Sequence, residues 1–179
     1  MEILDKTVYT ARPEGCSEKE NECYDVLEKL GIEYGRVSHE HIGTIEGLFE
    51  VEKALGCKIL KNLFLCNQQK TDFYLLIMPG DKPFKTKFLS PQLGCSRLSF
   101  APSEFMEELI CCTPGSASVL GLLFDKEIKV RLVLDKDILK GEYFGCHPCD
   151  NSSSLKIKTA DIIEKFIPYT HHTPSYVEL

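Results

Sequence analysis

The sequence lacks the features that mark membrane, exported and duplex-binding proteins. No apolar run approaches the roughly 18 residues that span a bilayer, so we expect no transmembrane helix and no membrane partner. The N-terminus has early acidic residues and no apolar core of a signal peptide, which favours a cytoplasmic location. The net charge of −6 gives no overall basic surface, so DNA is not an expected partner.

The sequence also lacks the common catalytic and cofactor motifs. It contains no G-x-S-x-G, no Walker loop and no G-x-G-x-x-G. Nine cysteines, an odd number without an export signal, indicate free thiols in a reducing compartment. Cys146 and Cys149 form a C-x-x-C, but no second such pair or H-x-x-x-H completes four zinc ligands. We therefore expect neither a metal nor another cofactor, while zinc and redox roles stay open as lesser alternatives.

The chain has the composition and patterning of a globular α/β domain. Hydrophobic residues make up 43% of its 179 residues and charged residues 27%. Ser17 and Glu20 form a capping box that predicts a helix over 18–30. Two apolar runs, 60–67 and 73–78, predict a hairpin. The remaining pattern predicts strands over 32–39, 97–100, 117–124, 129–134 and 155–158, and helices over 44–55, 86–93, 103–109, 136–139 and 160–166.

Interleaved helices and strands with one antiparallel hairpin indicate an α/β fold with a mixed sheet. We expect a leader over residues 1–16, one domain over 17–168, and a tail over 169–179. His171 and His172 then fall in the tail and are expected to be solvated. His39 and His41, at a strand end, are expected to be surface or loop residues rather than ligands.

Two places combine residue types suited to chemistry. Lys61 begins an apolar strand, where a buried ammonium is costly unless an anion pairs with it. The alternative is that its side chain reaches the sheet edge. Asn62 adds a donor and an acceptor at the same place. Gly115 and Ser116 follow Thr113-Pro114, so they form either a simple turn or a loop that presents backbone amides to a ligand.

Four motifs in this order carry a resemblance to a known family. They are KNLFL at 61–65, GCSRLSFA at 94–101, TPGS at 113–116 and FGCHP at 144–148. The chain resembles the free-standing prolyl-tRNA editing proteins of the YbaK/ProX type, which are similar to the editing insertion of bacterial prolyl-tRNA synthetases. The resemblance covers about 18–168, nearly the whole chain.

The resemblance implies a fold and an activity. The fold is a mixed, partly barrel-like central sheet flanked by helices. The activity is hydrolysis of the ester between a wrong amino acid and the terminal adenosine of tRNA(Pro). The branch that acts on alanyl-tRNA(Pro) is the most similar. Deacylation of cysteinyl-tRNA(Pro), or a non-catalytic module that binds RNA or an amino acid, are the alternatives. The implied partners are the acceptor end of tRNA(Pro) and, transiently, prolyl-tRNA synthetase.

The resemblance also implies site residues. Lys61 is the catalytic lysine, and the amides of Gly115 and Ser116 stabilise the developing oxyanion. The substrate-binding positions are Asn62, Val119, Gly121, His147 and Asn151, and Arg97 faces the acceptor stem. Two positions depart from the family: Val119 stands where a proline is usual, and Cys149 stands where the family has an asparagine.

Overall fold

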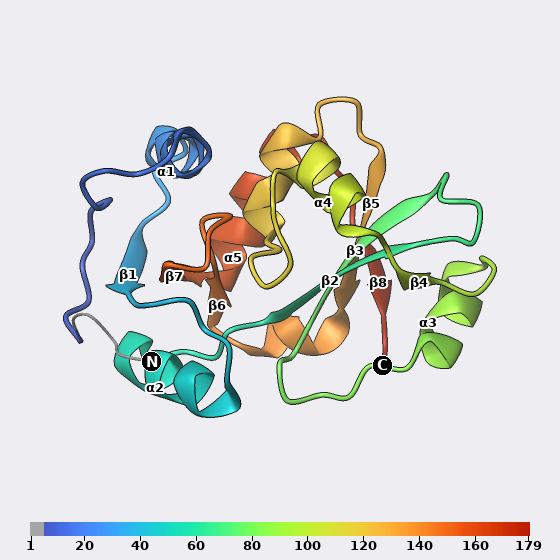
Figure 1. Cartoon of the computed structure of the whole chain (residues 1–179), viewed down its shortest axis with the longest axis horizontal. Helices are drawn as coiled ribbons and strands as arrows, with labels where there is room; N and C mark the ends of the chain where they lie inside the picture. Colours follow the sequence, from blue (N-terminus) through green and yellow to red (C-terminus); the bar gives the residue numbers. More distant parts are fainter. Residues whose placement is uncertain (1–5) are drawn as a thin grey trace.

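The strands divide between two sheets, each with its own helices (Figure 1). This computed structural model describes residues 6–179. The first sheet is antiparallel and has the order β1 (Tyr34–Ser38), β7 (Ser153–Lys158), β6 (Tyr143–Cys146). The second has the order β4 (Ser99–Phe100), β2 (Lys61–Cys66), β3 (Phe73–Met78), β5 (Val130–Asp135), β8 (Ser175–Val177).

The second sheet is mixed, which confirms the predicted fold class. β2 pairs antiparallel with β3 and β4, while β5 is parallel to both β3 and β8. The sheet expected to be central and partly barrel-like is divided into two sheets in the structure. Among the described residues the two sheets are joined by one isolated bridge, between Ile59 and Gly145, and they close no barrel.

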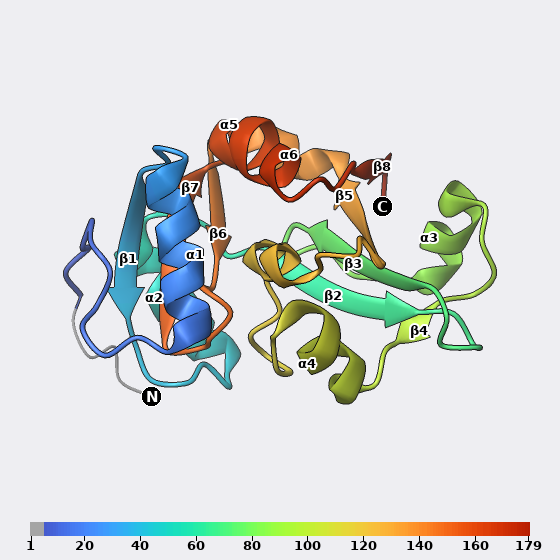
Figure 2. The same cartoon turned by 90° about the horizontal axis from the view of Figure 1, so that it is seen from above.

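Helices cover the sheets on several sides (Figure 2). The capping box is present as predicted: Ser17 N–H donates to Glu20 Oε2 at 2.9 Å, and Glu20 N–H donates to Ser17 Oγ at 3.4 Å. None of the helices in residues 6–179 combines the length and apolar character of a membrane span. The longer helices are α1 (Glu18–Lys29), α2 (Ile45–Leu55), α3 (Thr86–Leu93) and α4 (Ser103–Ile110). A C-terminal run follows β7, made of α5 (Thr159–Asp161), the π-helical η3 (Ile162–Phe166) and α6 (Ile167–Tyr169).

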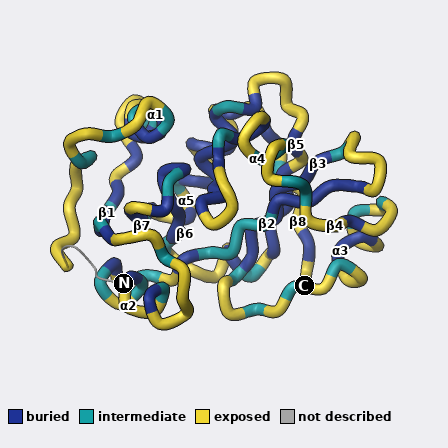
Figure 3. The backbone as a smooth tube through the Cα atoms, viewed as in Figure 1, coloured by how far each residue is buried: buried dark blue, intermediate teal, exposed yellow. Residues whose placement is uncertain are grey.

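The β2–β3 pair separates two hydrophobic clusters, because successive strand residues face opposite sides. Phe64, Leu75 and Ile77 face the larger cluster, which includes α1, α4 and the first sheet. Leu65, Leu76 and Met78 face the smaller one, beside α3 and β8. All six residues of β3 are buried, so this strand runs through the centre of the molecule (Figure 3).

The strand predicted over 117–124 is wrong. Residues 119–124 form the 3₁₀-helix η1 (Val119–Phe124), with Ser118 Oγ accepting from Leu120 N–H at 3.1 Å. Gly121 allows η1 to lie against α4, since a Cβ there would be 2.6 Å from the Ile110 carbonyl oxygen. A short apolar run does not distinguish a buried strand from a buried helix by its pattern alone.

Three smaller expectations also change. β6 was not predicted. The one-turn helix expected over 136–139 is the 3₁₀-helix η2 (Lys136–Lys140). The segment expected as a C-terminal tail contributes β8, which pairs with β5 through Ser175, Tyr176 and Val177.

We expect Val119→Pro to leave the free energy of unfolding within about 1 kcal/mol of the wild type. Val119 is the first residue of η1, and Ser118 before it has the extended backbone (φ −150°, ψ 147°) that precedes a proline without clash. Leu120→Pro removes an amide that donates to Ser118, so it should cost about 3 kcal/mol or more. Urea unfolding compares the two, and equal losses would contradict this account of η1.

Candidate functional site

The two sheets meet where β6 passes the entry to β2. Leu60 N–H donates to the Gly145 carbonyl at 3.0 Å. A Cβ at Gly145 would lie 2.3 Å from the Lys58 carbonyl oxygen, so only glycine permits this approach. Lys61 directly follows Leu60, and His147 comes two residues after Gly145. Their Cα atoms therefore lie within roughly 16 Å of each other.

Lys61 is half-buried and keeps an ammonium that no carboxylate neutralises among the described residues. Its Nζ donates to the Lys82 carbonyl oxygen at 2.7 Å. The side chain of Lys82 is itself fixed, with Nζ 2.7 Å from Asp135 Oδ2 and 2.8 Å from Asp137 Oδ2. Burial lowers the pKa of Lys82, but the hydrogen bonds to these carboxylates outweigh it and raise the pKa overall. Because an ammonium has three donors, Lys61 retains two for a ligand.

Asn62 points to the other face of β2, so the prediction that it adds to the same place as Lys61 is wrong. Lys61 pairs in register with Met78 of the smaller cluster, and Asn62 with Ile77 of the larger one. Asn62 Nδ2 donates to the Leu60 carbonyl at 3.0 Å. Its Oδ1 is buried and has no hydrogen-bond partner within residues 6–179. Such an atom is costly unless a ligand or water satisfies it.

The 113–116 turn is closed by its own hydrogen bonds. Ser116 N–H donates to the Thr113 carbonyl at 2.9 Å, and Ser116 Oγ lies 3.0 Å from both the nitrogen and the oxygen of Thr113. The expectation that the Ser116 amide faces an oxyanion is therefore wrong. Gly115 has φ +90°, a backbone conformation that L side chains rarely adopt.

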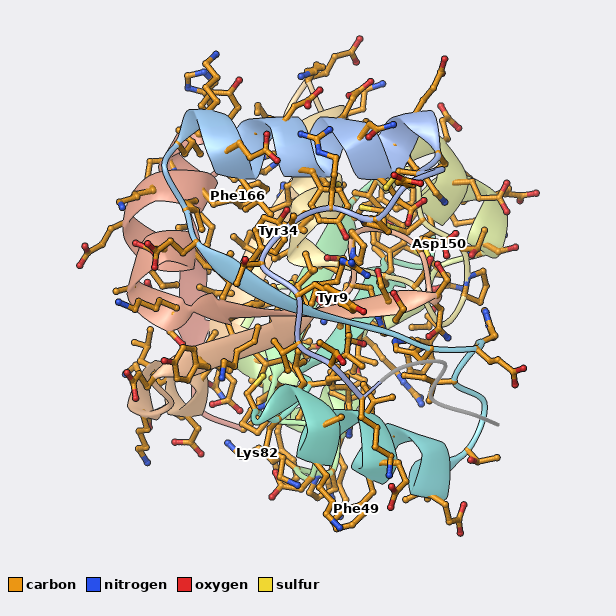
Figure 4. The ribbon with its side chains drawn as sticks, turned by 90° about the vertical axis from the view of Figure 1, so that its left-hand side faces the viewer. Tyr9, Tyr34, Phe49, Lys82, Asp150 and Phe166 are labelled. Carbon is orange, nitrogen blue, oxygen red and sulfur yellow. The ribbon has the colours of Figure 1, made fainter. Side chains whose placement is uncertain are left out.

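Three loops meet around Gly115. A Cβ on Gly115 would lie 3.6 Å from Asn151 Nδ2 and 3.8 Å from His41 Nε2. Asn151 clamps the backbone of Ile42, donating to its carbonyl at 3.1 Å and accepting from its amide at 3.3 Å. Figure 4 shows Asp150 at the end of the first sheet where β1 leads into residues 39–43. The segments 39–43, 113–116 and 147–151 thus form one cluster, called the loop cluster below.

His147, the first residue of the 147–151 segment, belongs to a buried, uncharged hydrogen-bond network at the base of the loop cluster. Its Nδ1 lies 2.8 Å from the Ser153 carbonyl oxygen, so Nδ1 carries the proton and Nε2 is left as an acceptor. Ser154 Oγ bridges to His39 Nε2 at 2.8 Å, and His39 Nδ1 donates to the Glu40 carbonyl at 2.7 Å. Burial lowers the pKa of His147 to about 4 and also lowers that of His39. Both imidazoles are neutral near pH 7.

The other predicted positions lie outside the loop cluster. Val119 is fully buried, and Gly121 lies against Ile110 of α4. Arg97 is exposed between α3 and β4. No hydrogen bond or ion pair in the described part of the chain joins Lys61 to the 113–116 turn. A cleft of about 810 Å³ lies between the N-terminal segment and β1, and no predicted site residue lines it.

Comparison with known proteins decides the family. The model of the aminoacyl-tRNA editing domain matches residues 39–165, a span that contains the loop cluster and Lys61. The chain belongs to the aminoacyl-tRNA editing domain family. It is 29% identical to the prolyl-tRNA editing protein ProX of Acetoanaerobium sticklandii over 153 residues, which cover 86% of this chain and 93% of that protein.

Two further relatives agree with this assignment. The prolyl-tRNA synthetase associated domain-containing protein 1 of Danio rerio is 31% identical over 155 residues, covering 86% of this chain and 83% of that one. A solved structure provisionally described as a trans-editing enzyme for prolyl-tRNA synthetase shares the fold. It has a TM-score of 0.63 and 15% identity, over 92% of this chain and 99% of that chain.

Sequence reasoning missed two histidines of this editing-domain chain. His39, expected at the surface, is 1% exposed and bonded to Ser154. The alternation of strand residues could have predicted this burial, because His39 lies two residues after Val37 and faces the same buried side as Val37. His172, expected to be solvated, is 4% exposed and lies 2.9 Å from Asp125 Oδ2. No local pattern indicates that contact, because 47 residues separate the partners.

The thiols of the C-x-x-C are both buried and free. Cys149 Sγ lies 3.7 Å from Cys23 Sγ of α1, and burial raises the pKa of the Cys146 thiol. Within residues 6–179, no group of three or more His, Cys, Asp or Glu residues has an arrangement that holds a metal ion. All nine cysteines are free thiols.

The neutral His147 predicts how stability depends on pH. Its pKa is about 4 when folded and 6.5 in its ordinary state, so the unfolded chain binds a proton first as the pH falls. His147 therefore lowers the free energy of unfolding between pH 6.5 and about 4, by up to about 3 kcal/mol. His147→Asn, which retains a donor near Nδ1, should show a shallower pH dependence in denaturant unfolding.

His171→Asn is the matched control, because His171 is exposed and has φ +63°, a conformation that asparagine tolerates. It should keep the wild-type pH dependence. A His147→Asn variant with an unchanged slope over this range would contradict the neutral network.

Proposed function

We propose that this chain removes wrong amino acids from tRNA(Pro) in trans, with alanyl-tRNA(Pro) as its main substrate. Its membership of the aminoacyl-tRNA editing domain family and the name of its ProX relative support the reaction class. Action on alanyl rather than cysteinyl ester is the finer part of the proposal, drawn from the motifs of the sequence. A cytoplasmic location and transient contact with prolyl-tRNA synthetase complete it.

The observation that carries the proposal is the uncompensated Lys61 ammonium. It is half-buried, and its hydrogen-bond partner is the neutral Lys82 carbonyl. A cation held in this way binds an anion with little competition from the protein itself. In the deacylation reaction the anion is the terminal phosphate of the tRNA or the oxyanion that forms as water attacks the ester.

No side chain of the loop cluster is set up as a nucleophile. Ser116 Oγ is engaged by Thr113, and its contacts include no histidine. In the proposed reaction water attacks the ester, which is intrinsically labile, and the protein supplies orientation. His147 Nε2 is an acceptor for the attacking water, the substrate ammonium or the ribose 2′-hydroxyl. The 2′-hydroxyl itself helps to activate the water.

Lys61→Met tests the role of the charge, since methionine keeps much of the apolar stem and removes only the ammonium. We expect kcat/KM for alanyl-tRNA(Pro) to fall by about 100-fold or more, the scale found when one oxyanion-stabilising group is removed. The control is Lys58→Met, because Lys58 is 74% exposed and pairs with Glu52. It should react like the wild type. A Lys61→Met variant with wild-type rates and unchanged melting would remove Lys61 from the mechanism.

A further inference from the structure

One stretch of this acidic chain carries positive charge only. Residues 82–103 contain Lys82, Lys85, Lys87 and Arg97 and no aspartate or glutamate, although the net charge of the chain is −6. Lys82 is held by Asp135 and Asp137. Lys85, Lys87 and Arg97 take part in no ion pair within residues 6–179. Their charges are therefore available to a partner.

These cations gather at one end of the molecule. Both views place α3 and β4 at the end opposite α1 and β1 (Figures 1 and 2). Arg97 lies between two clefts of about 620 Å³ each. Lys85 and Lys87 line one of them, and Lys70 lines the other. Neither cleft has an acidic residue in its lining, and both contain hydrogen-bonding side chains such as that of Thr86.

Exposed aromatic rings lie among the cations. Phe100 is 65% exposed on the two-residue edge strand β4, and Phe88 is 52% exposed on α3. The ring of Phe84 meets Phe100 edge-on, with centroids 6.2 Å apart, and Lys87 Nζ lies 5.0 Å from the centroid of Phe88. Cations that track a phosphate backbone, together with rings on which bases stack, are typical of surfaces for single-stranded nucleic acid.

This surface is connected to the candidate site through Lys82. The Lys82 carbonyl accepts a hydrogen bond from Lys61 Nζ. Lys85 follows Lys82 by three residues, so the Cα atoms of Lys82 and Lys85 are at most about 11 Å apart. An RNA whose aminoacylated end lies at Lys61 therefore reaches Lys85 with its next nucleotides.

We propose that Lys70, Lys85, Lys87, Phe88 and Phe100, which together with Arg97 form the basic face, bind the sugar–phosphate backbone of the substrate RNA next to its aminoacylated end. Phe100 stacks on an unpaired base there. The inference rests on the proposed function and extends it, because it assigns RNA contacts outside the loop cluster. An anionic membrane or an acidic protein would also match the charges, and the surface next to Lys61 favours RNA because the aminoacylated end of the substrate lies there.

The experiment compares two substrates that share the ester and differ in the RNA. One is alanyl-tRNA(Pro), and the other is alanyl-adenosine, which lacks every phosphate. The variants are Lys85→Ala with Lys87→Ala, and separately Phe100→Ala. The control is Lys29→Ala with Lys165→Ala, which removes two exposed lysines from α1 and η3. Binding of uncharged tRNA(Pro) is measured for each protein between about 50 and about 500 mM salt, a range of about one decade.

We expect the Lys85/Lys87 variant to lose about tenfold in kcat/KM on alanyl-tRNA(Pro) and nothing on alanyl-adenosine. Its slope of log Kd against log salt should fall by about 1 to 2, because two phosphate contacts are lost. Phe100→Ala should weaken tRNA binding with an unchanged slope. The control should match the wild type in all measurements.

Three results would overturn the basic face. One is tRNA affinity equal to that of the control, and another is equal loss on both substrates. The third is a Lys85/Lys87-dependent affinity for phosphatidylserine vesicles with tRNA binding unaffected, which would assign the face to membranes. A wild-type protein that hydrolyses neither substrate contradicts the proposed function instead, and the binding of uncharged tRNA then still tests the face.

Discussion

The close approach of Gly145 to residues 58–60 is the constraint on which the site depends. Any side chain at Gly145 would collide with the Lys58 carbonyl, and the Leu60 amide would lose its acceptor on β6. This contact, an isolated bridge between Ile59 and Gly145, joins two sheets that are built from distant parts of the chain. It places the entry of β2, with Lys61, near the loop that follows β6, with His147. The remaining features of the site are local consequences of that junction.

The site is organised by neutral hydrogen bonds, with its charges kept at one place. His39, Ser154 and His147 form an uncharged chain under the loop cluster, and Asn151 fixes Ile42 by two amide contacts. Neutral networks of this kind are favourable when every member is satisfied. The charged side chains lie on the side of Lys82. The fully buried Asp135 forms an ion pair with Lys82, and the carbonyl of Lys82 positions the ammonium of Lys61. Lys61 is therefore oriented without being neutralised.

Local signals in the sequence predicted most of the regular elements. The capping box gave α1, and the two apolar runs gave the β2–β3 hairpin. Failures occurred where tertiary contacts decide. Residues 119–124 are helical because Gly121 lets them lie against Ile110, and β8 forms because β5 offers it an edge. Such partners are distant in sequence, and periodicity does not reveal them.

The residues of the site could likewise be predicted only in part, where local motifs rather than tertiary contacts define them. Motif resemblance identified the family and brought together Gly115, His147 and Asn151, which the structure places at or beneath the loop cluster. It did not show that Lys61 and Asn62 face opposite sides of β2, or that Ser116 uses its own amide within the turn. Those facts depend on register and on side-chain hydrogen bonds. They remove the Ser116 amide from the expected oxyanion contacts, while the role of the Gly115 amide stays a prediction.

The most direct test of the account is the rate at which the purified chain deacylates alanyl-, cysteinyl- and prolyl-tRNA(Pro), each against spontaneous hydrolysis. The proposed function predicts that the alanyl ester is cleaved fastest and that the prolyl ester, the correct product, is spared. Fastest cleavage of the cysteinyl ester would move the assignment to that substrate. Hydrolysis of prolyl-tRNA(Pro) as fast as alanyl-tRNA(Pro), or of none of the three, would contradict an editing function.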